Sequence, residues 1–168
     1  MSVCYDSQVI LNENNYAFID AQNVVRGISD LGWKIDWGKF RIYLREKYSA
    51  TKAFIFIGKI HSYKRLYDYL RGCGYILVFK PTTRNKKIIK GNCDGDLILH
   101  ALTNNKYDAA IIVSSDGDFY SLVRYLRKKR KLKVVLSPHA NTCSKLLKYQ
   151  AKGNINYMNQ LKEKLSEK

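Results

Sequence analysis

The sequence predicts a three-layer α/β/α sandwich built around a mostly parallel central sheet. Short runs that are apolar throughout alternate with segments whose apolar residues recur at helical spacing. Strands that are apolar throughout are typical of parallel sheets, because such strands are buried on both faces. Short connections between the two kinds of segment favour strand–helix units with helices on both sides of the sheet.

The expected elements follow one another along the chain with little between them. Apolar runs predict strands over residues 16–19, 53–57, 75–79, 109–113 and 132–136, with a late strand near 155–158. Helical spacing predicts helices over residues 37–48, 63–70, 94–102, 119–126, 144–150 and 160–168. We therefore expect an N-terminal extension over 1–15, one domain over 16–152, and a strand and helix over 153–168 that pack on the same domain.

Length and composition exclude several classes of protein. The chain has 168 residues, of which 46% are hydrophobic and 12% aromatic, so it is not an intrinsically disordered chain. It has no apolar run near the ~18 residues of a membrane span and no signal-peptide pattern at its start. Its four cysteines form no C-x-x-C pair, which favours reduced, mostly buried thiols. These features predict a cytoplasmic protein without a membrane partner.

Charge is distributed very unevenly along the chain. The formal net charge is +16, which favours a polyanionic partner, nucleic acid before an acidic membrane surface. Residues 91–120 nevertheless hold five aspartates and only one lysine. Basic residues gather on either side of this segment and predict a track for a phosphate backbone. The residues that we expect in this track are Lys80, Arg84, Lys86, Lys87, Lys90, Arg124, Arg127 and Lys128.

Aspartates stand where predicted strands end and helices begin. Asp20 follows the first apolar run, Asp116 and Asp118 follow the fourth, and Asp94 and Asp96 open the helix after the third. Ligands of parallel sheets bind beyond the carboxyl ends of the strands, so these groups can converge on one edge. Carboxylates that close together repel one another unless a cation lies among them, and Mg²⁺ and Mn²⁺ prefer such oxygen ligands. A basic protein with this site is suited to metal-assisted phosphodiester hydrolysis.

Other interpretations of these residues remain open. An aspartate at a helix start also serves as an N-cap, and Asp96 and Asp118 would suit a helix dipole. The D-x-D pattern of residues 116–118 also fits a phosphatase or a nucleotide-sugar transferase. Glycine-rich phosphate-binding motifs and a nucleophile elbow are absent from the sequence.

Three segments resemble the motifs of a known family. FIDAQN (Phe18–Asn23), KGNCDGDLILHAL (Lys90–Leu102) and IIVSSDGDF (Ile111–Phe119) are similar, in order and spacing, to the three motifs of NYN domains, in particular the LabA-like group. The resemblance runs from about Tyr16 to Lys152. The sequence departs from the motifs at Ala21 and Ser115, where glycine is common.

The resemblance implies a PIN-like fold, a site for Mg²⁺ or Mn²⁺, and ribonuclease activity. It places the metal-binding acids at Asp20, Asp94, Asp116 and Asp118, with Asp96 second in rank, and a supporting asparagine at Asn23. We expect Asn23 and Ser114 or Ser115 to orient water or phosphate.

The resulting hypothesis is a metal-dependent endoribonuclease that hydrolyses single-stranded RNA. The alternative is a non-catalytic RNA-binding or regulatory module on the same fold. An edge strand or the C-terminal helix is a candidate surface for a homodimer.

Overall fold

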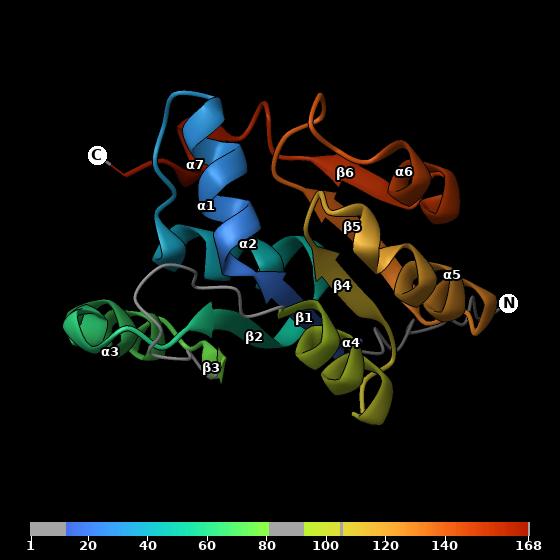
Figure 1. Ribbon diagram of the computed structural model, residues 1–168, viewed down its shortest axis with the longest axis horizontal. Coiled ribbons are helices and arrows are strands. Elements are labelled where there is room, and N and C mark those ends of the chain that lie inside the picture. Colours follow the sequence, from blue (N-terminus) through green and yellow to red (C-terminus); the bar gives the residue numbers. More distant parts are fainter. Residues whose placement is uncertain (1–12, 81–92, 105, 168) are drawn as a thin grey trace, which may run out of the picture.

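A six-stranded, entirely parallel sheet forms the centre of the computed structural model (Figure 1). The structure describes residues 13–80, 93–104 and 106–167. The strands are β1 (Asn15–Asp20), β2 (Ala50–Gly58), β3 (Ile76–Lys80), β4 (Ala110–Val113), β5 (Leu132–Ser137) and β6 (Ile155–Tyr157). The helices are α1 (Ala21–Asp30), α2 (Trp37–Tyr48), α3 (Lys64–Gly72), α4 (Cys93–Thr103), α5 (Tyr120–Lys128), α6 (Lys145–Ala151) and α7 (Lys162–Leu165). Two 3₁₀ turns, His61–Tyr63 and Gly117–Phe119, complete the described elements.

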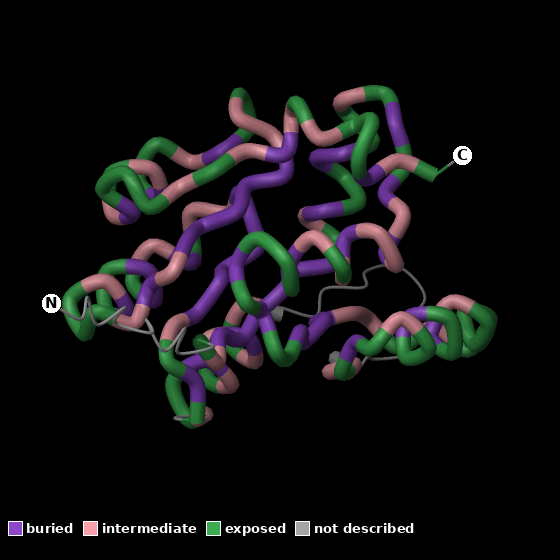
Figure 2. Tube along the Cα trace, turned by 180° about the vertical axis from the view of Figure 1, so that it is seen from behind, coloured by how far each residue is buried: buried purple, intermediate pink, exposed green. Residues whose placement is uncertain are grey.

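Two hydrophobic cores lie on opposite faces of the sheet and explain the three layers. The alternating side chains of β1 illustrate the division, with Ala17 and Ile19 in one core and Tyr16 and Phe18 in the other. The first core joins the sheet to α1, α2, α3 and α7, and the second joins it to α4, α5 and α6. The buried residues accordingly follow the strands through the middle of the molecule (Figure 2). The predicted α/β/α sandwich is confirmed.

The strand order, β3-β2-β1-β4-β5-β6, places the first strand between the two halves of the sheet. The chain builds one half outward from β1 to β3, then returns and builds the other half from β4 to β6. At this reversal, the segments that follow the two neighbouring strands lead away from each other. Their separation leaves room for a ligand beyond the carboxyl ends of the strands. The reversal lies between β1 and β4, and Asp20 ends the first of these strands while Asp116 and Asp118 follow the second.

Helix α1 is the main element that the sequence analysis missed. It begins directly after β1, and the Asp20 carboxylate caps it by accepting a hydrogen bond from Asn23 N at 3.2 Å. Val24 and Ile28 bury its inner face. At the other end of the chain, the expected helix over 160–168 is limited to α7, although Leu165 is buried in the first core.

The two cysteines whose side chains the structure describes, Cys73 and Cys143, are free thiols. Cys73 is half-buried and Cys143 is buried. Burial raises the pKa of the Cys143 thiol, because the charged thiolate loses hydration. A nucleophilic role for Cys143 at neutral pH is therefore disfavoured.

Gly27 permits α1 to pack closely against the segment that follows β5. A Cβ atom at this position would lie 2.7 Å from the Cβ of Pro138, whose ring cannot rotate away. We expect Gly27→Ala to lower the free energy of unfolding by about 1–3 kcal/mol through overpacking. Gly72→Ala, the matched control, has open space around it and should be neutral or stabilising by about 0.4–1 kcal/mol. Urea denaturation of the two variants checks the prediction, and equal midpoints would contradict it.

Candidate metal centre

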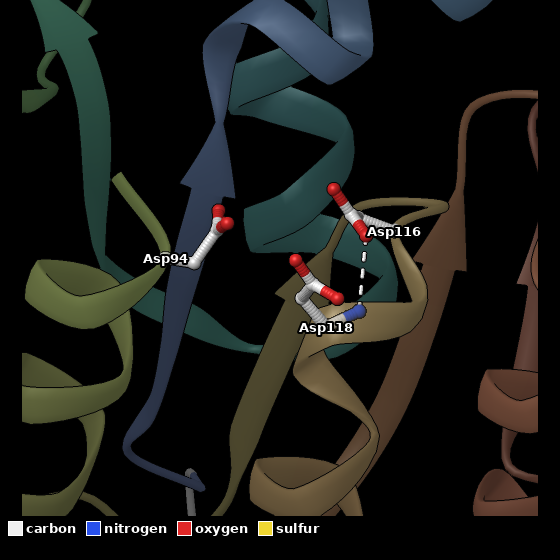
Figure 3. A group of neighbouring side chains, drawn as sticks. All are labelled: Asp94, Asp116 and Asp118. Atoms are coloured by element: carbon white, nitrogen blue, oxygen red, sulfur yellow. Dashed lines mark hydrogen bonds between the residues drawn. The ribbon is translucent and has the colours of Figure 1, made fainter. Parts of the chain in front are cut away.

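Three carboxylates converge at the carboxyl edge of the sheet, beside the reversal in strand order. Asp94 comes from the first turn of α4, Asp116 from the loop after β4, and Asp118 from the 3₁₀ turn that follows (Figure 3). One carboxylate oxygen of each lies within 4.8 Å of the others. Asp94 and Asp116 are half-buried and Asp118 is exposed, so the group faces solvent on one side.

The donor set of this group fits a hard divalent cation. All three ligands are carboxylate oxygens, the type that Mg²⁺ and Mn²⁺ prefer over softer metals. Like charges at this spacing repel, and a cation among them would remove the repulsion. Three protein ligands also leave coordination positions for water and for a phosphate oxygen, as a catalytic ion requires.

Hydrogen bonds hold the two aspartates of the β4 loop in fixed relation. The Asp118 backbone N–H donates to Asp116 Oδ1 at 3.0 Å, so Asp116 caps the 3₁₀ turn that carries Asp118 (Figure 3). The Asp116 N–H in turn donates to Ser114 Oγ at 3.1 Å. The local turn therefore places both carboxylates on the same side of the loop.

Asn23 links this loop to helix α1. Its Oδ1 accepts a hydrogen bond from the Ser115 backbone N–H at 2.7 Å, and its own N–H donates to the cap at Asp20. The end of β1, the start of α1 and the loop after β4 are thus connected through one side chain. This contact gives Asn23 a positioning role at the site, and its expected role in orienting water or phosphate stays a prediction.

The two serines of the loop are also used within the fold. Ser114 and Ser115 are buried, and the Ser115 hydroxyl lies 2.9 Å from that of Ser137 on β5. The Ser115 carbonyl accepts a hydrogen bond from Ser144 N at 3.0 Å. Both serines therefore support the backbone of the site, and the expectation that one of them orients water or phosphate stays a prediction.

Two of the predicted metal ligands lie outside the converging group. Asp20 is 7% exposed and its Oδ1 accepts the cap hydrogen bond of α1. Asp96 is half-buried on α4, two positions after Asp94. Residues two apart on a helix point in different directions, so Asp96 faces another side of α4 than Asp94 does.

The predicted basic track is only partly within the described residues. Arg84, Lys86, Lys87, Lys90 and the side chain of Lys80 lie outside them. On α5, the Arg124 guanidinium lies over the Tyr120 ring at 5.9 Å, and Arg127 Nε donates to the Gln150 carbonyl at 2.8 Å. Helix α5 runs back toward the start of β5, so Arg127 and Lys128 lie near the edge of the sheet opposite the carboxylates.

A pocket of about 420 Å³, lined mainly by polar and charged residues, borders the carboxylate group. It lies between α1, the loop after β4 and the segment before α6, and Asp116 belongs to both the pocket and the carboxylate group. Sequence patterns did not predict Arg26, Gly27 and Asp30 in this lining, because these residues lie on the unpredicted helix α1. The lining residues are Asn23, Arg26, Gly27, Asp30, Ser115, Asp116, Gly117, Thr142 and Ser144.

The fold and the carboxylate group define a doubly wound α/β protein with a candidate hard-metal centre at its strand reversal. The NYN domain matches residues 16–157. The chain belongs to the NYN domain family, a family of PIN-like nuclease domains.

Comparison with solved structures supports the same fold. The crystal structure of a protein of unknown function, VPA0982 from Vibrio parahaemolyticus, is similar to this chain with a TM-score of 0.74 and 24% sequence identity. The similarity covers 91% of this chain and 96% of that one. No curated protein matches the chain. Among the described residues, no helix has the length and apolar character that a membrane span needs.

Proposed function

We propose that the chain is a metal-dependent ribonuclease of the LabA-like group of NYN domains. The observation that carries the proposal is the convergence of Asp94, Asp116 and Asp118 at the strand reversal. This concentration of negative charge stands in a chain whose net charge is +16. RNA is the polyanion that both features suit, because the positive surface attracts a phosphate backbone and a divalent cation bridges it to the carboxylates.

The three carboxylates would hold Mg²⁺ or Mn²⁺. A bound ion of this kind supplies polarisation of the phosphate and activation of a water molecule for attack on phosphorus. Asp20, beyond the spacing of the group, would act through a water molecule at the end of β1. The half-buried positions of Asp94 and Asp116 reduce the dielectric around the charges and strengthen their attraction for the cation.

The chain's own residues would orient the substrate in this site. Asn23 ties the β4 loop to α1, and the Ser115 hydroxyl ties the same loop to Ser137 on β5. Arg124 and the basic residues between 80 and 90 would contact backbone phosphates outside the metal centre. Preorganised ligands of this kind lower the cost of aligning water and phosphate for reaction.

Cleavage of a labelled single-stranded RNA tests the proposed function. We expect the purified chain to cut the RNA in Mn²⁺ or Mg²⁺ and to leave it intact in excess EDTA. Gel analysis over time, with RNA binding measured in parallel by a filter assay, gives both quantities. Salt-dependent binding without cleavage in either metal would overturn the nuclease proposal and favour the non-catalytic RNA-binding module.

A further inference from the structure

The polar pocket beside Asp116 has the position of a substrate subsite. Its volume of about 420 Å³ falls within the roughly 300–1,000 Å³ of small-molecule pockets. It shares Asp116 with the carboxylate group, so a molecule in the pocket would have one end at the metal centre. The pocket lies beyond the carboxyl ends of neighbouring parallel strands, where such sheets bind ligands.

One face of α1 forms the long wall of this pocket. Asn23, Gly27 and Asp30 lie on that face at helical spacings of four and three residues. The stretch from Asn23 to Asp30 spans about 10 Å along the helix axis, at 1.5 Å per residue. That length suits a single nucleotide lying along the helix, with its phosphate near Asn23 and its base near Asp30.

The segment before α6 forms the opposite wall of the pocket. Two glycines allow it to pack closely against the rest of the site. A Cβ atom at Gly117 would lie 2.7 Å from Ser144 Oγ, and one at Gly27 would lie 2.7 Å from Pro138 Cβ. The segment before α6 can therefore approach both the β4 loop and α1. Its Thr142 and Ser144 add hydroxyl groups to the pocket, and these can donate to or accept from a sugar or phosphate.

The pocket carries a positive charge at Arg26 and a negative charge at Asp30, at different points along its length. Both groups are available to a ligand. Arg26 lies one helical turn from Asn23, and Asp30 lies one turn further on. Neither takes part in an ion pair among the described residues. Arginine is well suited to bind a phosphate, whereas a carboxylate accepts hydrogen bonds and so selects a base with N–H donors. Guanine presents two adjacent N–H donors on its Watson–Crick edge, which match the two oxygens of Asp30.

We propose that this pocket binds one nucleoside monophosphate unit of the RNA next to the cleaved bond, with guanine preferred. Arg26 would bind the phosphate and Asp30 the guanine base. The inference rests on the proposed ribonuclease function, since it assigns the pocket to that enzyme's substrate. It adds a base preference that the metal centre alone does not supply.

Calorimetric titration of the full chain with nucleoside monophosphates in Mg²⁺ tests the subsite. The probes are the 5′- and 3′-monophosphates of guanosine, adenosine, cytidine and uridine. We expect a guanosine monophosphate to bind at least about tenfold more tightly than the others, as for other bidentate contacts to a base. Equal affinity for the four bases would overturn the guanine preference, and binding by none would overturn the subsite.

Two variants separate the roles of the charged residues. Arg26→Gln should lower the binding affinity for all the monophosphates about tenfold. Asp30→Asn should abolish the preference for guanine while preserving the affinity for adenosine monophosphate. Both residues are exposed, so their replacement should leave the thermal midpoint nearly unchanged. Arg65→Gln on α3 and Glu46→Gln on α2, exposed positions outside the pocket, are the matched controls. Loss of affinity in the controls as large as in the variants would overturn the assignment.

Parallel RNA cleavage distinguishes failure of the subsite from failure of the proposed function. Wild type and Asp30→Asn could cut the RNA in Mn²⁺ at the same positions while neither binds a monophosphate. That result would overturn the subsite alone. The chain could instead bind guanosine monophosphate selectively, respond to both variants as described, and leave RNA uncut. That result would overturn the nuclease function and support a nucleotide-binding pocket.

Discussion

Replacing Asp116 with asparagine should reduce metal-dependent RNA cleavage by at least about 100-fold, more than the 10–100-fold typical of residues that only support a metal ligand. Asparagine keeps an oxygen that can accept the Asp118 N–H, so the 3₁₀ turn should remain capped. It removes one of three negative charges within 4.8 Å of one another. The variant therefore changes the charge of the proposed metal centre without removing the hydrogen bond that shapes the loop.

The measurements are cleavage rate in Mn²⁺, RNA affinity in EDTA, and the rise in thermal midpoint caused by the metal. We expect the first and third to fall and the second to stay the same. Asp68→Asn is the matched control, because this exposed carboxylate on α3 forms only surface ion pairs with Lys64 and Arg71. Turnover of Asp116→Asn equal to that of wild type, in a preparation free of contaminating nuclease, would refute the assignment.

Asn23→Ala should lower RNA cleavage by roughly 10–100-fold although Asn23 lies outside the carboxylate group. The alanine variant leaves the Ser115 N–H without the acceptor that lies 2.7 Å away in the wild type, at a cost of about 1–3 kcal/mol. The β4 loop would then lose its link to α1. Asp116 follows Ser115 directly, so displacement of the loop would misplace a ligand.

Asn23→Asp tests whether the lost hydrogen bond is the cause. The aspartate retains an oxygen at the same position, and we expect it to recover most of the cleavage rate and of the unfolding free energy. Cleavage and urea denaturation of both variants provide the comparison. Equal loss of activity in Asn23→Asp and Asn23→Ala, with the stability of Asn23→Asp restored, would argue against a positioning role.

The central strands could be predicted because each is encoded locally. β1 and β4 are short and mostly apolar, and β2 holds a buried apolar run over residues 53–56, because burial on both faces allows few polar residues. Helix α1 was harder to predict, since its polar wall carries Asn23, Gly27 and Asp30, which are poor helix formers. Its strongest local signal was the cap at Asp20, a residue for which the sequence pattern indicated a metal ligand.

The same limit applies to the assignment of the aspartates. Their positions after strands predicted the edge of the sheet at which a metal centre would lie, and three of the five predicted ligands meet there. Local spacing could not decide whether Asp94 or Asp96 joins the carboxylate group, because the direction of each side chain depends on how α4 is rotated against the sheet. The basic run after Arg124 is close to the metal centre in sequence. The nine-residue helix α5 is roughly 13 Å long, however, so its last residues lie that far from its start.

The local pattern of the chain thus specifies the layers, most of the strands and the acidic character of one sheet edge. These features depend on the burial and periodicity of neighbouring residues, which can be read in order along the chain. Tertiary packing decides which carboxylates converge, which polar residues only support the loop, and where a pocket opens. Such features arise from contacts such as Asn23 with Ser115, 92 positions apart, and Gly117 with Ser144, whose geometry exists only after the sheet has assembled.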